Sequence, residues 1–406
     1  MGDVLVGRCP DRARAHRRRY RRTMAATLAS DLADGVCPFI IERAVMTQRW
    51  RDVTFAHWPV EVDAVRALLP PSLEPDLFDG RAWVSLVGFE MDELRIPGLP
   101  PIPTTHRFVE FNVRTYVIGP EGPGVWFCSL DVPNWLPVLV ARSGFALPYD
   151  KGSVAVTRQG DRIGWFVQRT WPERSEGELV VRRTGERIDA AADPLATFLT
   201  ARWRLYASTR GGVVLTAPVH HEPWPLEAAE LVSVDTGLAE AAGLPVGGEP
   251  IVHLASAVSV RVGLPRPIQS PDLPTGELVV HFDEDCGFCS ACVRVLQRFT
   301  DSTVTYTPTS RLEDPRLARL AEVAIIVTGD GPGGSGVAFG ADGVAAILGR
   351  CGSPGRVASA MLRAPVVHGI AGIVYARVAA NRQWISRRLG LRAACELPGA
   401  RSGTSI

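Results

Sequence analysis

Short apolar runs, rich in β-branched and aromatic residues, recur between residues 47 and 265 and are separated by turn-forming residues. This pattern predicts a series of strands at 84–89, 108–117, 125–130, 154–156, 164–168 and 213–217. Apolar residues at helical spacing predict two clear helices, at 60–69 and 195–205. Closely spaced strands with few helices are typical of a curled antiparallel sheet that forms a barrel or a sandwich.

A different pattern begins near residue 277. Residues 278–282 form a short apolar run that predicts a buried strand. Apolar side chains then recur on one face of a helix, at Phe288, Cys292, Val295, Leu296 and Phe299. A strand followed directly by an amphipathic helix indicates a second, smaller domain of the α/β type.

Two segments lack both patterns. Residues 1–45 carry a run of arginines without an apolar face, and we expect a disordered basic arm. Four prolines fall within residues 265–276 and predict a semi-rigid linker. The resulting domain boundaries are 46–264 for the β-rich domain and 277–400 for the smaller domain.

Composition narrows the possible partners and compartment. The net charge of +1 gives no reason to expect a nucleic-acid partner. No apolar stretch reaches the roughly 18 residues that a membrane-spanning helix needs. Eight cysteines among 406 residues are too few for a secreted disulfide scaffold. We therefore expect a cytoplasmic protein, in which a Cys-x-x-Cys pair favours catalysis over structural cross-linking.

The pair Cys286 and Cys289 lies where the strand at 278–282 turns into the helix. The free N–H groups and the dipole at a helix N-terminus stabilise a thiolate on the first cysteine, which would act as the nucleophile. Cys289, one turn further in and less exposed, is spaced to resolve a mixed disulfide. We expect Asp285 to cap the helix and Asp283 to carry the proton of the resolving thiol.

Two other interpretations of these cysteines remain open. They could be inert structural residues, or Cys292, Cys351 and Cys395 could complete a metal site with them. Zinc sites of this kind usually contain two separated Cys-x-x-Cys pairs, and this chain has one. We therefore expect neither a metal nor a cofactor. Gly287 is expected to keep the turn open to a partner sulfur.

The segment 282–289, which reads FDEDCGFC, resembles the opening signature of the DCC family of thioredoxin-like thiol-disulfide oxidoreductases. Residues 336–344 resemble the family's glycine-bearing hairpin, and 374–382 resemble its Tyr- and Arg-rich C-terminal helix. Cys395 with the following Leu-Pro resembles its closing tail. The resemblance covers about residues 276–400 and implies thiol-disulfide exchange without naming a substrate.

Glu110, Asn112 and Arg114 alternate along one predicted strand and therefore point to the same face. Inside a barrel they would form a polar lining, and a buried Glu–Arg pair would hold a carboxylate ligand or fix a catalytic carboxyl. On an open sheet they would form an ordinary solvent-facing strand. The sequence favours neither arrangement.

The β-rich region also resembles a known family. Segments at 48–50, 55–59, 79–84, 110–117, 124–131, 198–206 and 221–226 resemble the YqjF-like family, which is grouped with the acetoacetate-decarboxylase-like fold. That likeness draws attention to Lys151, in the region where acetoacetate decarboxylases carry their Schiff-base lysine. An adjacent second lysine is absent and Asp150 favours the charged amine, so we expect Lys151 to be unreactive.

These observations predict an α+β chain in which an acetoacetate-decarboxylase-like barrel or sandwich precedes a thioredoxin-like domain. The expected activity is thiol-disulfide exchange at Cys286 and Cys289, with a disulfide-containing protein or a small thiol as the partner. Binding of an apolar ligand or a carboxylate by the first domain is the alternative, and decarboxylase-like chemistry at Lys151 is a further one.

Overall fold

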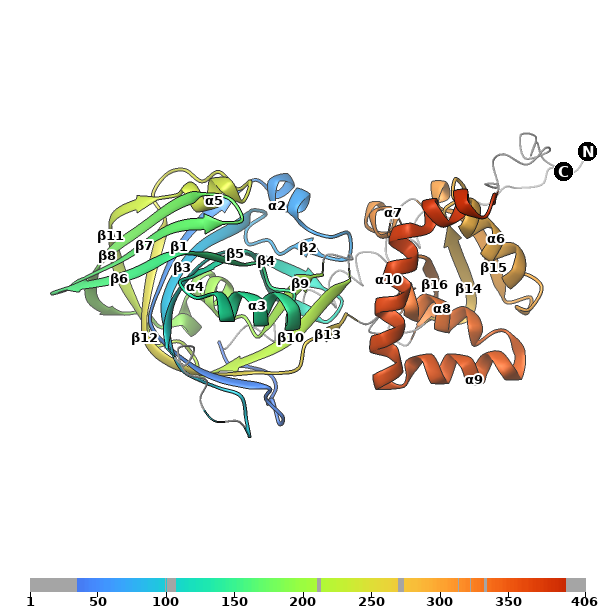
Figure 1. Ribbon diagram of the computed structural model, residues 1–406, viewed down its shortest axis with the longest axis horizontal. Coiled ribbons are helices and arrows are strands. Elements are labelled where there is room, and N and C mark those ends of the chain that lie inside the picture. The colour runs from blue at the N-terminus through green and yellow to red at the C-terminus, as the bar shows by residue number, and fades with distance from the viewer. Residues whose placement is uncertain are drawn as a thin grey trace, which may run out of the picture.

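The computed structural model describes residues 35–98, 100, 107–209, 213–268, 274–312, 314–321, 323–331 and 334–391. Within these ranges the chain forms a 13-stranded sheet and a separate 4-stranded sheet (Figure 1). The strands of the large sheet are β1 (Met46–Val60), β2 (Glu74–Pro75), β3 (Ala82–Arg95), β4 (Phe108–Gly119), β5 (Gly122–Val132), β6 (Tyr149–Gln159), β7 (Arg162–Trp171), β8 (Ser175–Arg187), β9 (Arg204–Ser208), β10 (Val214–His221), β11 (Leu226–Asp235), β12 (Ile251–Val262) and β13 (Arg266–Pro267). The expectation of a β-rich first region is confirmed.

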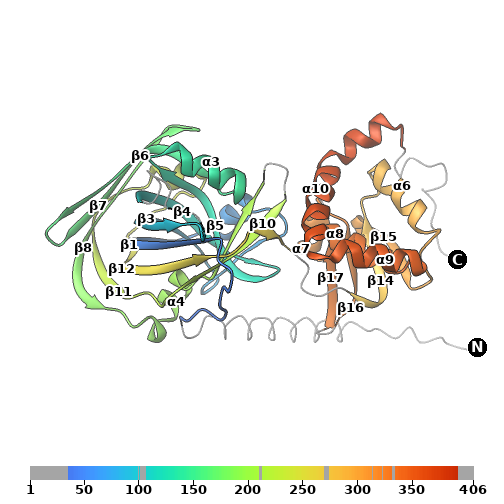
Figure 2. The ribbon, with the colours of Figure 1, turned by 60° about the horizontal axis from the view of Figure 1, so that its bottom comes forward.

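The large sheet closes on itself. β1 pairs with β3 on one side and with β12 on the other, while β5 pairs with both β4 and β6. The order β5-β6-β7-β8-β11-β12-β1-β3-β4 therefore returns to β5, and Figure 2 shows these strands curling around a common interior. The helices of this region are short: α2 (Val62–Leu68), α3 (Trp135–Gly144), α4 (Pro194–Thr200) and α5 (Gly237–Ala241).

Side-chain alternation along the strands builds two apolar clusters. On β4, Phe111 and Val113 pack in a cluster that contains Trp165. Phe55 and Phe89 belong to the other cluster. Because successive side chains of a strand point to opposite faces, Glu110, Asn112 and Arg114 face away from the Trp165 cluster.

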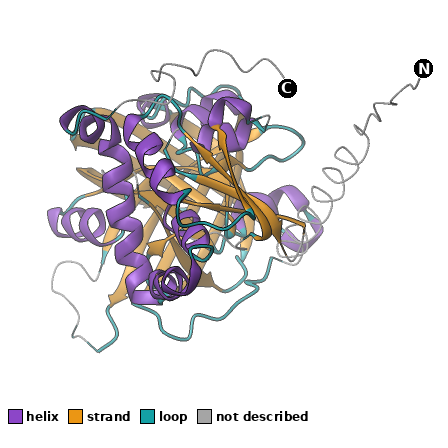
Figure 3. Cartoon of the chain, turned by 90° about the vertical axis from the view of Figure 1, so that its right-hand side faces the viewer, coloured by secondary structure: helices purple, strands orange, loops and turns teal. Residues whose placement is uncertain are grey.

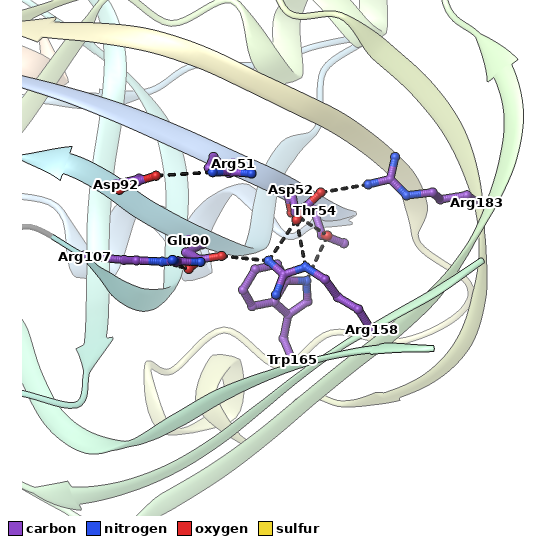
Figure 4. A network of polar contacts seen from close by, with 9 residues as sticks. All are labelled: Arg51, Asp52, Thr54, Glu90, Asp92, Arg107, Arg158, Trp165 and Arg183. Atoms are coloured by element: carbon purple, nitrogen blue, oxygen red, sulfur yellow. Dashed lines mark hydrogen bonds and ion pairs between the residues drawn. The ribbon is translucent and has the colours of Figure 1, made fainter. Parts of the chain in front are cut away.

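An ion-pair network ties β1 to distant strands (Figure 4). A β-bulge between Arg51 and Thr54 places Asp52 at a φ of 49°, in the left-handed region. The Asp52 carboxylate accepts hydrogen bonds from Arg158 of β6 and Arg183 of β8, each at 2.9 Å. The bulge thus directs one carboxylate toward strands that β1 does not pair with.

The small sheet follows the order β15-β14-β16-β17, with bounds β14 (Thr275–Phe282), β15 (Val304–Pro308), β16 (Ile326–Gly331) and β17 (Gly334–Phe339). β14 is parallel to β15, and β16 is antiparallel to both β14 and β17. The helices are α6 (Gly287–Leu296), α7 (Pro315–Ala321), α8 (Gly340–Leu348), α9 (Gly352–Arg363) and α10 (Pro365–Arg388). Helices gather in this part of the molecule, whereas the first part is mainly strand (Figure 1). Viewed from the side of the small sheet, the helices lie in front of the strands (Figure 3).

Two sequence expectations, on a helix end and on the N-terminal arm, need correction. The helix expected at 195–205 ends at Thr200, because the chain enters β9 at Arg204. The basic arm ends before residue 45: Ile41 is buried and its carbonyl accepts a hydrogen bond from Arg261 at 2.9 Å. Residues 1–34 lie outside the described ranges.

The linker expectation is also wrong in part. Arg266 and Pro267 form strand β13 against β10, a place at the edge of a sheet that tolerates proline. β14 already begins at Thr275, and residues 269–273 lie outside the described ranges. In the part of the chain that the structure describes, no helix is both long and apolar enough to cross a bilayer.

Candidate functional site

Cys286 is the N-cap residue of α6. Its backbone is extended and its Sγ accepts a hydrogen bond from the N–H of Cys289 at 3.4 Å. The expectation that Asp285 caps the helix is therefore wrong by one residue; the N–H of Asp285 instead donates to Oδ1 of Asp283 at 3.0 Å. A sulfur facing the first amides of a helix is placed where negative charge is stabilised.

The exposure of the two thiols is the reverse of what the sequence predicts. Cys286 is 0% exposed, whereas Cys289 is only half-buried. Burial is the main cause that raises the pKa of Cys289 well above its ordinary value. The hydrogen bond with Cys286 and the negative charge of the Cys286 thiolate raise it further. Cys289 is therefore a neutral thiol at physiological pH.

The end of α10 covers the turn that holds Cys286. A Cβ added to Gly287 would lie 2.2 Å from the carbonyl oxygen of Leu391 and 2.6 Å from Oγ of Ser386. Gly287 thus permits close packing of the chain that follows α10, and the expectation that it leaves the turn open is wrong. Only a residue without a side chain fits here.

An ion pair and two hydrogen bonds hold the loop between β14 and α6. Oδ2 of Asp283 lies 2.9 Å from Nη2 of Arg382, which comes from α10. The carboxylate of Glu284 accepts hydrogen bonds from the N–H and the hydroxyl of Thr309, both at 3.1 Å. The position of the cysteine pair is therefore fixed by residues far from it in sequence.

A cavity of about 520 Å³ lies beside the pair. Its walls are mainly apolar and include Cys289 and Cys292, with Asp283 and Arg382 among its polar groups. The hydroxyl of Tyr375, another lining residue, accepts a hydrogen bond from a backbone N–H at 2.7 Å. Cys289, and not Cys286, is the member of the pair that lines this cavity.

The described part of the chain gives no support for a metal site at the pair. Among the described residues, no group of three or more His, Cys, Asp or Glu side chains could hold a metal ion. Cys351 is the N-cap residue of another helix, α9, and Cys395 lies outside the described ranges. Burial raises the pKa of Cys292 above its ordinary value.

The polar triplet on β4 lies inside the closed sheet. Glu110, Asn112 and Arg114 are 2%, 2% and 7% exposed and line a cavity of about 170 Å³. The solvent-facing alternative is therefore excluded for this strand.

Glu110 pairs with a tyrosine and not with Arg114. Its Oε2 accepts a hydrogen bond from the Tyr149 hydroxyl at 2.7 Å, and Nδ2 of Asn112 donates to its Oε1 at 3.4 Å. No ion pair between Glu110 and Arg114 is found among the described residues, and their positions on the strand are about 13 Å apart. Burial raises the pKa of Glu110 to about 7.

Lys151 takes no part in this cavity. Its Nζ donates to the carbonyl of Gly152 at 3.3 Å, and the residue is not among those that line the cavity. The neighbouring Asp150 pairs with Arg142 at 2.7 Å and with Arg169 at 3.3 Å. The geometry gives decarboxylase-like chemistry at Lys151 no support.

Comparison with known proteins identifies the family. Residues 47–259, which are 213 of the 406 residues, match DUF2071, a family described as an uncharacterized conserved protein. The chain belongs to the DUF2071 family. The DUF2071 region is also 38% identical over 218 residues to the uncharacterized protein YqjF of Bacillus subtilis (strain 168), covering 53% of this chain and 89% of that protein.

The region after the DUF2071 match has its own relatives. Residues 280–388 match the DCC1-like thiol-disulfide oxidoreductases. The suspected resemblance of each half of the chain to its family is thus confirmed.

Solved structures match the chain only at low identity and with low TM-scores. The enduracididine biosynthesis enzyme MppR, complexed with pyruvate, is 15% identical with a TM-score of 0.41, covering 57% of this chain and 93% of that one. Acetoacetate decarboxylase from Legionella pneumophila is 11% identical with a TM-score of 0.42, and the match covers 59% of this chain and 95% of that one. Likeness at this level supports no statement about chemistry.

Sequence reasoning missed two residues at these sites. Tyr149, the partner of Glu110 in the DUF2071 cavity, stands two positions before Lys151, and no sequence pattern links it to Glu110. Arg382, the partner of Asp283, lies in the Tyr- and Arg-rich helix that carried the DCC resemblance. Its position in that helix was a usable signal, whereas its pairing with Asp283 depends on tertiary packing.

Proposed function

We propose that the chain is a thiol-disulfide oxidoreductase that uses Cys286 and Cys289 as its redox pair. The observation that carries the proposal is the helix N-terminal placement of Cys286, whose Sγ faces the N–H of Cys289 at 3.4 Å. The match of residues 280–388 to DCC1-like oxidoreductases supports it. The strand order β15-β14-β16-β17, with a helix between the parallel pair and a hairpin at the other edge, supports a thioredoxin-like arrangement.

The reaction balances as a two-electron exchange. Once the end of α10 and the residues after it move away from the buried Cys286, its thiolate attacks one sulfur of a substrate disulfide, forms a mixed disulfide and releases the first substrate thiol. Cys289 then loses its proton and attacks Sγ of Cys286, which releases the second substrate thiol and leaves a Cys286–Cys289 disulfide. A small thiol or a reduced protein partner restores the dithiol, as the cytoplasm would allow.

Asp283 is the base that accepts the proton of Cys289 in the resolving step. Asp283 and Cys289 line the same cavity, and the negative charge of Asp283 contributes to the raised pKa of Cys289. A base near a thiol with a raised pKa assists the resolving step, in which that thiol must ionise. The ion pair with Arg382 holds Asp283 in place for this role.

Trapping a mixed disulfide tests the proposal. The reduced protein is treated with an aryl disulfide that releases a coloured thiol, and the adducts are mapped by mass spectrometry. Cys289→Ser should retain a stable adduct on Cys286. Cys286→Ser should form no adduct that an internal disulfide can displace, and Cys292→Ser should behave as the unmodified chain does. Complete turnover by Cys286→Ser, or zinc bound to the purified pair, would refute the assignment.

A further inference from the structure

Arg114 is a buried guanidinium without a carboxylate partner. It is 7% exposed, and no ion pair joins it to any of the described residues. Other buried arginines of the DUF2071 region are paired: Arg169 with Asp131 at 2.7 Å, and Arg202 with Asp76. A buried charge is costly unless an opposite charge compensates it, so Arg114 departs from the pattern of its own fold.

The contacts that Arg114 does make leave part of its charge uncompensated. Its Nη2 donates to the carbonyl of Leu199 at 3.2 Å, and its guanidinium lies 5.3 Å and 5.7 Å from the ring centres of Phe55 and Tyr116. Its Nε is buried and has no hydrogen-bond partner. A neutral carbonyl and two ring faces stabilise a cation less than an anion does.

The cavity that Arg114 lines restricts what such an anion can be. It measures about 170 Å³, and its walls are predominantly apolar, with Trp50, Phe89 and Phe127 among them. An engineered cavity of about 150 Å³ in another protein holds benzene, so this one fits a ligand of about that size. The other lining arginines already have partners: Arg202 pairs with Asp76 and Arg204 with Glu121.

The polar triplet on β4 has no place for a second negative group of the ligand. Glu110 stands about 13 Å along β4 from Arg114, and a second anion there would meet a carboxyl group instead of a cation. Asn112 lies between them with a buried Oδ1 that has no partner, so the row offers one cationic end only. The site therefore suits one negative charge on an apolar body.

We propose that the DUF2071 cavity binds a small apolar monocarboxylate whose carboxylate pairs with Arg114. The ligand is held by an ion pair and by apolar contact, and no covalent bond forms. This differs from Schiff-base chemistry, because Lys151 does not line the cavity. The proposal is independent of the thiol chemistry at Cys286.

Calorimetric titration of the full-length protein tests the proposal with two matched probes. Benzoate supplies a carboxylate on an apolar ring, and benzamide has nearly the same shape without the charge. Hexanoate serves as the chain-shaped carboxylate, with hexanamide as its neutral counterpart. Arg114→Met removes the charge and keeps an apolar side chain of similar length, while Arg182→Met removes an arginine from the exposed ion pairs of β8.

The expected result is saturable binding of benzoate or hexanoate at one site, with the matching amide at least about tenfold weaker. Arg114→Met should weaken carboxylate binding by at least about tenfold, and Arg182→Met should leave it unchanged. Equal binding of acid and amide would overturn the proposal, as would failure of both acids to bind at millimolar concentration. If Arg114→Met does not fold, the comparison of acid with amide in the unmodified chain decides the question.

Discussion

Replacing Glu110 with glutamine should stabilise the protein at high pH and have little effect at low pH. Burial raises the pKa of Glu110 from 4.5 to about 7, against the opposing hydrogen bonds from Tyr149 and Asn112. Because the folded-state pKa is above the unfolded value, the folded protein binds more protons between these two pH values. Stability is therefore lost as pH rises, and the loss is complete above about pH 7.

The size of the effect follows from the same two pKa values. A difference of one pKa unit corresponds to about 1.4 kcal/mol, so the interval from 4.5 to about 7 corresponds to about 3 kcal/mol. Glutamine keeps the packing, and its carbonyl can accept the hydrogen bond of Tyr149. Its amide nitrogen then takes the place of Oε1, which faces Nδ2 of Asn112 at 3.4 Å. A half-turn of the Asn112 amide brings Oδ1, which has no partner, to that nitrogen as an acceptor.

Urea denaturation of both proteins in parallel, across this pH range, measures the effect. The free energy of unfolding of Glu110→Gln should exceed that of the unmodified chain by about 3 kcal/mol above pH 7, and this difference should shrink toward zero near pH 4.5. Titration of other groups, such as Asp150 with a pKa of about 6, occurs in both proteins and cancels in the difference. A difference that does not change with pH, or a variant less stable above pH 7, would refute the reasoning.

Three further predictions follow from packing. Arg169→Met leaves a fully buried carboxylate unpaired and should cost about 3–5 kcal/mol in urea denaturation, whereas Arg182→Met, at an exposed ion pair, should cost less than about 1 kcal/mol. Gly287→Ala should displace the end of α10 and so speed the labelling of Cys286 by iodoacetamide, measured by peptide mass spectrometry. The control Gly372→Ala, whose Cβ would meet ordinary contacts at 3.5 Å, should leave the labelling rate unchanged, and equal rates in the two variants would contradict the reasoning. Limited proteolysis should cut between β13 and β14, and first cleavage within β4 or β5 would contradict the predicted domain boundary.

The alternation on β4 shows how far sequence reasoning reaches. It correctly placed Glu110, Asn112 and Arg114 on one face, because that depends only on the two-residue period of a strand. Whether the face is interior depends on the closure of the sheet, which joins β4 to β5 and β1 to β12. Local pattern carries no information about closure, so both arrangements stayed open until the structure was known.

The cysteine pair shows a different limit. The strand and helix around it were predictable from the local apolar pattern, and so was the position of Cys286 at the turn. The burial of Cys286 was not, because Ser386 and Leu391 cover the turn from about one hundred residues further along the chain. The cap was assigned to Asp285 on residue preference, whereas the sulfur itself accepts the amide hydrogen bond.

The closed sheet also has a consequence for synthesis on the ribosome. Met46 pairs with Val262, so 216 further residues must be synthesised before Met46 of β1 can pair with β12. At translation rates of about 5–20 residues per second this delay is about 10–40 s. During that interval the nascent chain presents an unpaired strand edge, the feature that promotes pairing with other chains. Chains interrupted before β12 should therefore need a chaperone to remain in solution, whereas completed chains should release it.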